Sequence, residues 1–213
     1  MRGNHGDSVA VSASQSGKRP LLGVPFDMPS FLINRFTVHA FNTAYFYAGL
    51  AERKRAKIHY DAFFYPLDAV RNWNRLYGRR GFLQYQCVVS PPNEKLAVEE
   101  ILDRILHSRL VCGLAVLKRF GSVRSPGMLS FPRRGTTLAL DFPIEGEGAF
   151  RLCEELDKIV GRNSGAVYLA KDARVSRNSF GIFYPQWGEF SQFVDPHFSS
   201  SLWRRLAGNE LEQ

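Results

Sequence analysis

The order of apolar and polar positions between residues 82 and 170 predicts a β-sheet with helices packed on one of its faces. We predict strands over 82–89, 111–120, 137–143 and 166–170, and helices over 94–107 and 148–160. The strand segments are rich in β-branched and aromatic residues, whereas the helical segments repeat apolar residues at helical spacing. The resulting β-α-β-β-α-β order predicts an α+β class with a ferredoxin-like antiparallel sheet and both helices on one face.

Segments on either side of this unit complete the predicted organisation. Residues 1–20 are rich in Ser, Gly and charge and are predicted to form a flexible arm, whereas residues 21–213 form one domain. Further elements are predicted outside the sheet: a helix from about Asn34, a strand over 58–65, and helices over 67–77, 176–183, 187–194 and 200–207.

The strand FLQYQCVV, residues 82–89, has an unusual polar face. Leu83 and Tyr85 point to one side, and Gln84 and Gln86 point to the other, because successive side chains of a strand alternate. If the helices cover the apolar side, the two amides lie on the open face of the sheet. Such a face either hydrogen-bonds a ligand or meets water, and the residue pattern leaves these alternatives about even.

Alternation on the other strands adds further side chains to this open face. They are Thr137, Ala139 and Asp141 on one strand, Leu114, Val116 and Lys118 in one register of another, and Tyr168 on the last. Lys171 follows the last strand. Together with the two amides, these groups predict the floor of a ligand pocket. The alternative for each lysine is a solvated surface position, and for Asp141 a turn at the end of its strand.

The composition is that of a folded protein with a large core, since 45% of the residues are apolar and 17 are Phe. The net charge of +8 fits an anionic ligand, a nucleic acid or an acidic membrane surface, but the dispersed Lys and Arg residues favour a generally basic surface. The three cysteines lack Cys-x-x-Cys spacing, which predicts buried free thiols in a reducing, cytoplasmic compartment. With neither a membrane-spanning apolar run nor a signal peptide, any membrane contact is predicted to be peripheral.

Common catalytic motifs are missing from the sequence. The five histidines lie far apart without metal-ligand spacing, so no metal site is predicted. No P-loop, no Gly-x-Ser-x-Gly and no Gly-x-Gly-x-x-Gly after a strand is present.

Three segments, however, carry a resemblance that is long and specific: DAFFYPLDAVRNWNRLYGRRGFLQYQCVV, GMLSFPRRGTTLALDFPIEG and GAVYLAKDARVS. They resemble the C-terminal half of FAD-linked oxidoreductases of the vanillyl-alcohol-oxidase type, and among them the decaprenylphosphoryl-β-D-ribose 2′-oxidase group. The resemblance covers roughly residues 20–205. It implies that residues 21–213 are a substrate-binding cap domain whose sheet roofs the flavin ring.

The resemblance also implies site residues. The positions that match site-lining positions of the family are Gln84, Gln86, Leu114, Val116, Lys118, Tyr168 and Lys171. Two positions depart from the best-known members, since Phe64 stands in place of a tyrosine and Ala139 in place of a cysteine. These departures leave the identity of the substrate open.

The resemblance implies a mechanism in which Gln84 and Gln86 hold an alcohol carbon of a sugar, such as a lipid-linked pentose, against the flavin. Lys171 stabilises negative charge near the flavin, Tyr168 positions the ring or the substrate, and Lys118 meets a phosphate or a polar sugar group. The FAD-binding half of the family has no counterpart in these residues, so a separate FAD-binding half is the expected partner, and residues 1–20 resemble the linker to it.

Two other functions fit parts of the pattern. A ferredoxin-like sheet can bind single-stranded RNA, but RNA-binding sheets place aromatic residues where this chain has Gln84 and Gln86, so no nucleic acid is expected. A non-catalytic fragment of a split gene is the second alternative. The resemblance favours the oxidoreductase, which is predicted to be inactive as this chain alone.

Overall fold

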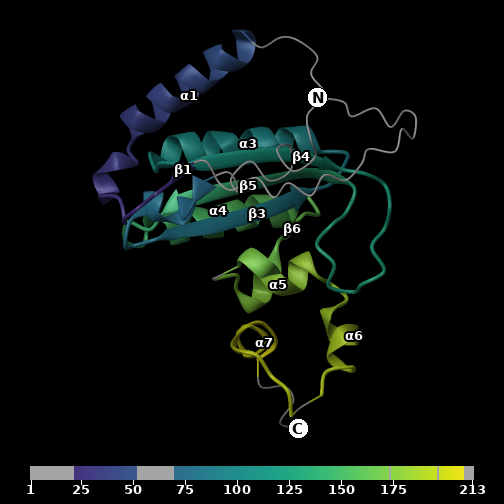
Figure 1. The fold of residues 1–213 in the computed structure, drawn as a ribbon. Helices are drawn as coiled ribbons and strands as arrows, with labels where there is room; N and C mark the ends of the chain where they lie inside the picture. The colour runs from purple at the N-terminus through teal and green to yellow at the C-terminus, as the bar shows by residue number, and fades with distance from the viewer. Residues whose placement is uncertain (1–21, 52–69, 173, 196, 209–213) are drawn as a thin grey trace, which may run out of the picture.

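The computed structural model describes residues 22–51, 70–172, 174–195 and 197–208 (Figure 1). The helices and strands before the sheet are β1 (Leu22–Gly23), η1 (Ser30–Leu32), α1 (Arg35–Ala51), β2 (Val70–Arg71) and η3 (Trp73–Tyr77), where η marks a short 3-10 helix. The central unit comprises β3 (Phe82–Val89), α3 (Glu94–Ser108), β4 (Leu114–Phe120), β5 (Gly135–Pro143), α4 (Gly148–Arg162), β6 (Ala166–Val167) and η4 (Leu169–Lys171). The last helices are α5 (Arg177–Phe183), α6 (Trp187–Ser191) and α7 (Ser201–Ala207).

The four strands of the central sheet lie in the order β4-β5-β3-β6, and every neighbouring pair is antiparallel. The predicted α+β class with an antiparallel sheet is therefore confirmed. The ferredoxin-like assignment itself stays a prediction, because β6 comprises only two residues and pairs with β3 only at Cys87 and Val88.

One face of the sheet is covered by α3 and α4, which pack against each other and against β5 and β3. The β3 and β5 residues on this face are buried, as are many apolar residues of the two helices, whereas Leu117 on the edge strand β4 and Leu96, Leu102 and Leu106 on α3 are exposed. These core residues include Leu83, Tyr85, Cys87, Leu138, Leu140 and Phe142 from the strands, and Ile101 and Leu156 from the helices. Burial of this face holds β3 in register, since a shift of one residue would expose all of its apolar side chains.

A buried ion pair joins α4 to the segment after β6. Arg174 donates two hydrogen bonds of 2.8 Å to the carboxylate of Asp157, and the Tyr85 hydroxyl donates a third at 3.1 Å. The next acidic residue along the chain, Asp172, accepts hydrogen bonds from the backbone of Val175 and from the Arg205 side chain on α7. These bonds fix the path of the chain from β6 to the C-terminal helices.

Several predicted elements have different bounds in the structure. The strand predicted from residue 111 begins at Leu114, and the strand predicted over 166–170 ends at Val167, because residues 169–171 turn into η4. The helix predicted over 67–77 is present as the short 3-10 helix η3 over Trp73–Tyr77, which ends at Gly78 as predicted, but it is wrong at Val70 and Arg71, which form β2. The helix predicted over 187–194 ends at Ser191.

Other predictions agree with the structure or lie outside the described residues. The helix expected from Asn34 is α1, and the Asn34 side chain caps it by accepting from the N–H of Phe36 at 2.8 Å. All three cysteines are free thiols, and none of the described helices has the length and hydropathy needed to cross a membrane. Phe64, the arm of residues 1–20 and the strand predicted over 58–65 lie outside the described part of the chain.

Candidate functional site

The sheet face opposite α3 and α4, called the open face below, carries the predicted glutamines. The β3–β5 register places Gln84 beside Asp141 and Gln86 beside Ala139. The β4–β5 register then places Leu114 beside Asp141, Val116 beside Ala139 and Lys118 beside Thr137. The structure thus selects the register of β4 in which these three side chains share the face of the glutamines.

A polar cluster occupies one end of the open face and is centred on Asp141, a carboxylate that is only 3% exposed. Gln84 donates its side-chain N–H to one carboxylate oxygen at 3.0 Å, and the Tyr77 hydroxyl donates to the other at 3.4 Å. Burial raises the pKa of Asp141, and the nearby Lys171 ammonium and the two hydrogen bonds counteract part of this shift. We call these four residues, Tyr77, Gln84, Asp141 and Lys171, the polar end of the open face.

The position of Tyr77 depends on a glycine. A Cβ atom at Gly113 would lie 2.7 Å from the Tyr77 hydroxyl, so only glycine leaves room for the ring at this point. The N–H of Gly113 also donates to the backbone carbonyl of Asp141 at 2.8 Å. Burial next to Asp141 raises the pKa of Tyr77, so its hydroxyl keeps its proton and acts as a donor.

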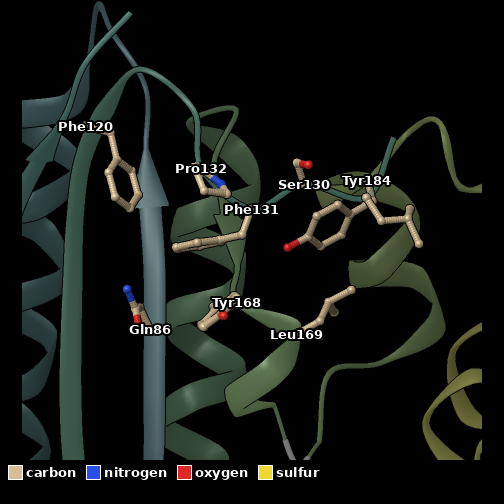
Figure 2. A pocket seen from close by; sticks show the side chains of 9 residues that line it. Gln86, Phe120, Ser130, Phe131, Pro132, Tyr168, Leu169 and Tyr184 are labelled. Atoms are coloured by element: carbon tan, nitrogen blue, oxygen red, sulfur yellow. The ribbon is translucent and has the colours of Figure 1, made fainter. Parts of the chain in front are cut away.

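A cavity of about 440 Å³ occupies the other end of the open face. Figure 2 shows the side chains around it, which come from β3, β4, the 121–134 loop, the chain from Tyr168 into η4, and the chain after α5. They are Gln86, Phe120, Leu129, Ser130, Phe131, Pro132, Tyr168, Leu169 and Tyr184. Because most of these side chains are apolar or aromatic, we call this region the aromatic end.

Phe131 is the central side chain of the aromatic end. Its ring lies 4.8 Å from the ring of Tyr168 and 5.9 Å from that of Phe120, measured between centroids. The Tyr184 hydroxyl donates to the carbonyl of Val167 at 2.6 Å, which holds the wall of the cavity against β6. The cavity is therefore formed by packed aromatic rings on a fixed sheet.

Gln86 lies between the two ends. Its side-chain N–H donates to the hydroxyl of Thr137 at 3.3 Å, and its backbone carbonyl accepts from the N–H of Tyr168 at 2.8 Å. The same side chain lines the aromatic cavity, whereas Gln84 and Lys171 line a second, much smaller hollow. The smaller hollow is also lined by Leu83, Tyr85 and Cys153, so it reaches the helix-covered side, whereas the aromatic cavity lies on the open face.

The structure brings most of the predicted site residues onto this face. Gln84, Gln86, Leu114, Val116, Ala139 and Tyr168 share the open face by strand register or by pairing with β3. Lys171 lies on η4 next to the polar end, and Lys118 is exposed near the end of β4. Phe64 is outside the described residues, so its place near the site stays a prediction.

Four residues of the site were not predicted from the sequence as site residues. Asp141 was placed on the correct face but weighed as a turn former, whereas Tyr77, Phe131 and Tyr184 were not considered. A signal for Phe131 was present, because a large aromatic residue next to a proline in a polar loop often packs against the body of a protein. The link from Tyr77 to Asp141 joins residues 64 positions apart, and no local pattern reports it.

Comparison with known proteins relates this chain to part of an oxidase. No protein-family model matches the sequence. The chain is 37% identical over 194 residues to decaprenylphosphoryl-beta-D-ribose oxidase of Mycolicibacterium smegmatis, and the alignment covers 87% of this chain and 41% of that protein. It is also 37% identical over 131 residues to an uncharacterized protein in the mprA 5′ region of Streptomyces coelicolor, which covers 59% of this chain and 35% of that protein. The chain spans less than half the length of these curated relatives, and it is distantly homologous to part of a larger oxidase.

Proposed function

We propose that this chain supplies the substrate-binding side of an FAD-dependent oxidoreductase that oxidises a CH–OH group of a sugar, with a lipid-linked pentose as the substrate class. The observation that supports this most strongly is the homology to a ribose-lipid oxidase, which extends over 87% of the chain. An alignment of that extent includes β3, β4, β5 and η4 wherever in the chain it starts. The open face is therefore built from segments shared with that oxidase.

The residues of the open face fit the reactive ring of a flavin better than they fit the rest of the cofactor. The ring is flat and needs a smooth contact surface, which Val116 and Ala139 provide between the two ends of the face. The pyrophosphate needs a glycine-rich loop before a helix, and the sequence has no such motif after a strand. We therefore propose that an FAD-binding unit, on this polypeptide or another, binds most of the cofactor and presents the ring to this face.

Gln84 and Gln86 are suited to hold the hydroxyl groups of a sugar. A side-chain amide has two N–H donors and one carbonyl acceptor. The bond from Gln84 to Asp141 and the bond from Gln86 to Thr137 each use one donor and fix the orientation of the amide. The remaining groups of each amide then face the ligand without further loss of side-chain freedom.

Lys171 and Tyr168 act at the reacting carbon. When bound, flavin accepts the hydride that leaves this carbon. The alcohol oxygen gives up its proton to water in the same reaction, and the Lys171 ammonium, half-buried beside Asp141, stabilises the negative charge that develops on this oxygen before the carbonyl forms. Tyr168 lines the cavity beside Gln86 and positions the sugar ring.

The two ends of the open face contact different parts of the substrate. The aromatic end takes an apolar part of the substrate next to the sugar, since apolar and aromatic cavities of this size bury such groups. Lys118, exposed on the same face, meets a phosphate that joins the sugar to its lipid. Ala139 leaves space in the middle of the face, and Phe64 is proposed as a further substrate contact.

The test is a Lys171→Ala variant in a complex with an FAD-binding unit. We expect the turnover of the sugar alcohol to fall by about 100-fold, as is typical when one charge-stabilising group is removed from an enclosed site. Lys158→Ala is the control, because Lys158 is exposed on α4, on the covered side of the sheet. Unchanged turnover in Lys171→Ala would show that Lys171 has no part in the reaction.

A further inference from the structure

The helix α1 exposes an unusual number of aromatic side chains. Between 61% and 87% of the surface of each of five rings is exposed, and we call these five the α1 aromatic surface: Phe36, Phe41, Tyr45, Phe46 and Tyr47. In Figure 1, α1 extends away from the sheet and from the helices that cover it. Apart from the half-buried Val38, every α1 side chain whose exposure is described lies open to solvent.

An isolated helix of this kind is not expected to be stable in water. Isolated helices shorter than about 12–15 residues are marginal even when rich in alanine, and α1 has only 17 residues and contains many aromatic residues, which are weaker helix formers. At 100° per residue, the rings point to several sides of α1 rather than to one stripe. A helix that is apolar around most of its circumference is typically buried between other elements. The α1 aromatic surface is therefore expected to be covered.

The charge of α1 indicates whether a protein or a membrane surface covers this helix. Helices that lie on membranes usually combine one apolar face with a polar face rich in Lys and Arg. The helix α1 has the sequence RFTVHAFNTAYFYAGLA, in which Arg35 is the single Lys or Arg. Five aromatic rings of about 150–250 Å² each also approach the roughly 800 Å² that each partner buries in a stable protein interface. Both properties favour a protein partner.

The position at which α1 joins the rest of the fold indicates which protein covers it. The segment before α1 is bonded to η3, since the N–H of Met28 donates to the carbonyl of Arg75 at 2.9 Å and the Arg75 side chain donates to the carbonyl of Pro25 at 2.6 Å. The last residue of η3 is Tyr77, which donates to Asp141 at the polar end. The N-terminal end of α1 is thus connected through η3 to the polar end of the open face.

The length of the relatives supplies the second argument. The alignment to the Mycolicibacterium smegmatis oxidase includes α1 wherever it starts, and it leaves 59% of that protein unmatched. We infer that the α1 aromatic surface docks the FAD-binding unit, which is the part of the oxidase that the alignment leaves out. This inference rests on the proposed function and adds the surface by which the two units meet.

The probe is the unmatched part of the Mycolicibacterium smegmatis oxidase, expressed separately and loaded with FAD. Its dissociation constant for this chain is measured by isothermal titration calorimetry, for the unaltered chain and for a Phe41→Ser, Tyr45→Ser double variant. These two rings stack on each other with centroids 6.1 Å apart, and serine has a helix propensity similar to theirs. We expect the double variant to bind about tenfold more weakly or worse.

Phe198→Ser is the matched control, because Phe198 is a phenylalanine of similar exposure far from α1 in the sequence, and it should bind as the unaltered chain does. Equal binding by the double variant, or no binding by the unaltered chain, overturns the inference. Two further results also overturn it, provided that the double variant still binds the probe normally. They are that the double variant no longer binds phosphatidylglycerol vesicles, or that it no longer self-associates in sedimentation. A complex that forms through α1 but oxidises no sugar contradicts the proposed function alone.

Discussion

Two buried aspartates differ in their surroundings: Asp157 lies within the core of the fold, and Asp141 lies at the candidate site. Asp157 is 4% exposed and lies on the helix-covered side, where Arg174 pairs with both of its oxygens. Asp141 is 3% exposed and lies on the open face, where its hydrogen-bond donors are the neutral side chains of Gln84 and Tyr77. The charge of Asp157 is balanced by Arg174 within the fold, whereas Asp141 lies near Lys171 on the open face.

Replacement of Arg174 by Ala is expected to destabilise the protein strongly. It leaves the buried Asp157 carboxylate without its charged partner, which typically costs about 3–5 kcal/mol. Arg162→Ala is the control, since Arg162 pairs with Glu100 on the surface, where such pairs contribute about 0–1 kcal/mol. The free energy of unfolding from urea titrations measures both, and similar values for the two variants would contradict the structural role of Arg174.

Asp141 is expected to make the stability depend on pH. Because burial raises its pKa in the folded protein, the folded state keeps the proton where the unfolded state has lost it. This part of the stability is present below the ordinary aspartate pKa of 3.8 and is lost as the pH rises through the raised value. Asp141→Asn should lack this loss, so its free energy of unfolding relative to the unaltered protein should increase with pH. A constant difference would show that Asp141 titrates normally.

At the scale of elements, the 121–134 loop makes the cavity. Phe131 projects from this loop onto Tyr168 and is only 4% exposed. Phe131→Ala should cost about 3–5 kcal/mol in the free energy of unfolding, as is usual for a buried phenylalanine. Phe198→Ala should change it by no more than about 0.5 kcal/mol, because Phe198 is 78% exposed. An equally small effect of Phe131→Ala would mean that the loop does not close the cavity.

The elements that the sequence predicted well are those with a strong local signal. The strand β3 was predicted with its bounds and its two faces, because alternation between a buried and a polar face leaves a clear pattern. The register of β4 was left open, since that strand is apolar on both faces, and its pairing with β5 decided it. The strand β6 was predicted too long, because the residues after Val167 turn into η4 to meet the C-terminal helices.

The candidate site was predictable in part for the same reason. Gln84 and Gln86 were identified by alternation, and the resemblance to a family added Lys171 beyond the last strand. The contact of Tyr77 with Asp141 and the packing of Phe131 on Tyr168 depend on the tertiary fold. The helical pattern over 67–77 predicted the helical turn that holds Tyr77 but not the contact of its hydroxyl with Asp141.

At the scale of the whole molecule, the helix α1 is exposed along its length, and the open face of the sheet carries a cavity of about 440 Å³. They are joined through η3, whose Tyr77 reaches Asp141. A single FAD-binding unit that docks on α1 would also reach the open face, and both surfaces would then be explained by one partner. We therefore propose that the open face binds the substrate of a flavin-dependent oxidation.

The most direct measurement is the anaerobic reduction of flavin in the assembled complex on mixing with decaprenylphosphoryl-β-D-ribose, followed by loss of the yellow flavin absorbance. The account predicts rapid loss with the unaltered chain and at least about tenfold slower loss with Gln84→Ala, which removes a sugar contact and leaves Asp141 unpaired on one oxygen. Gln192→Ala, at an exposed position after α6, should behave as the unaltered chain does. Flavin reduction that is equally fast with Gln84→Ala, or absent with the unaltered chain, would contradict the account.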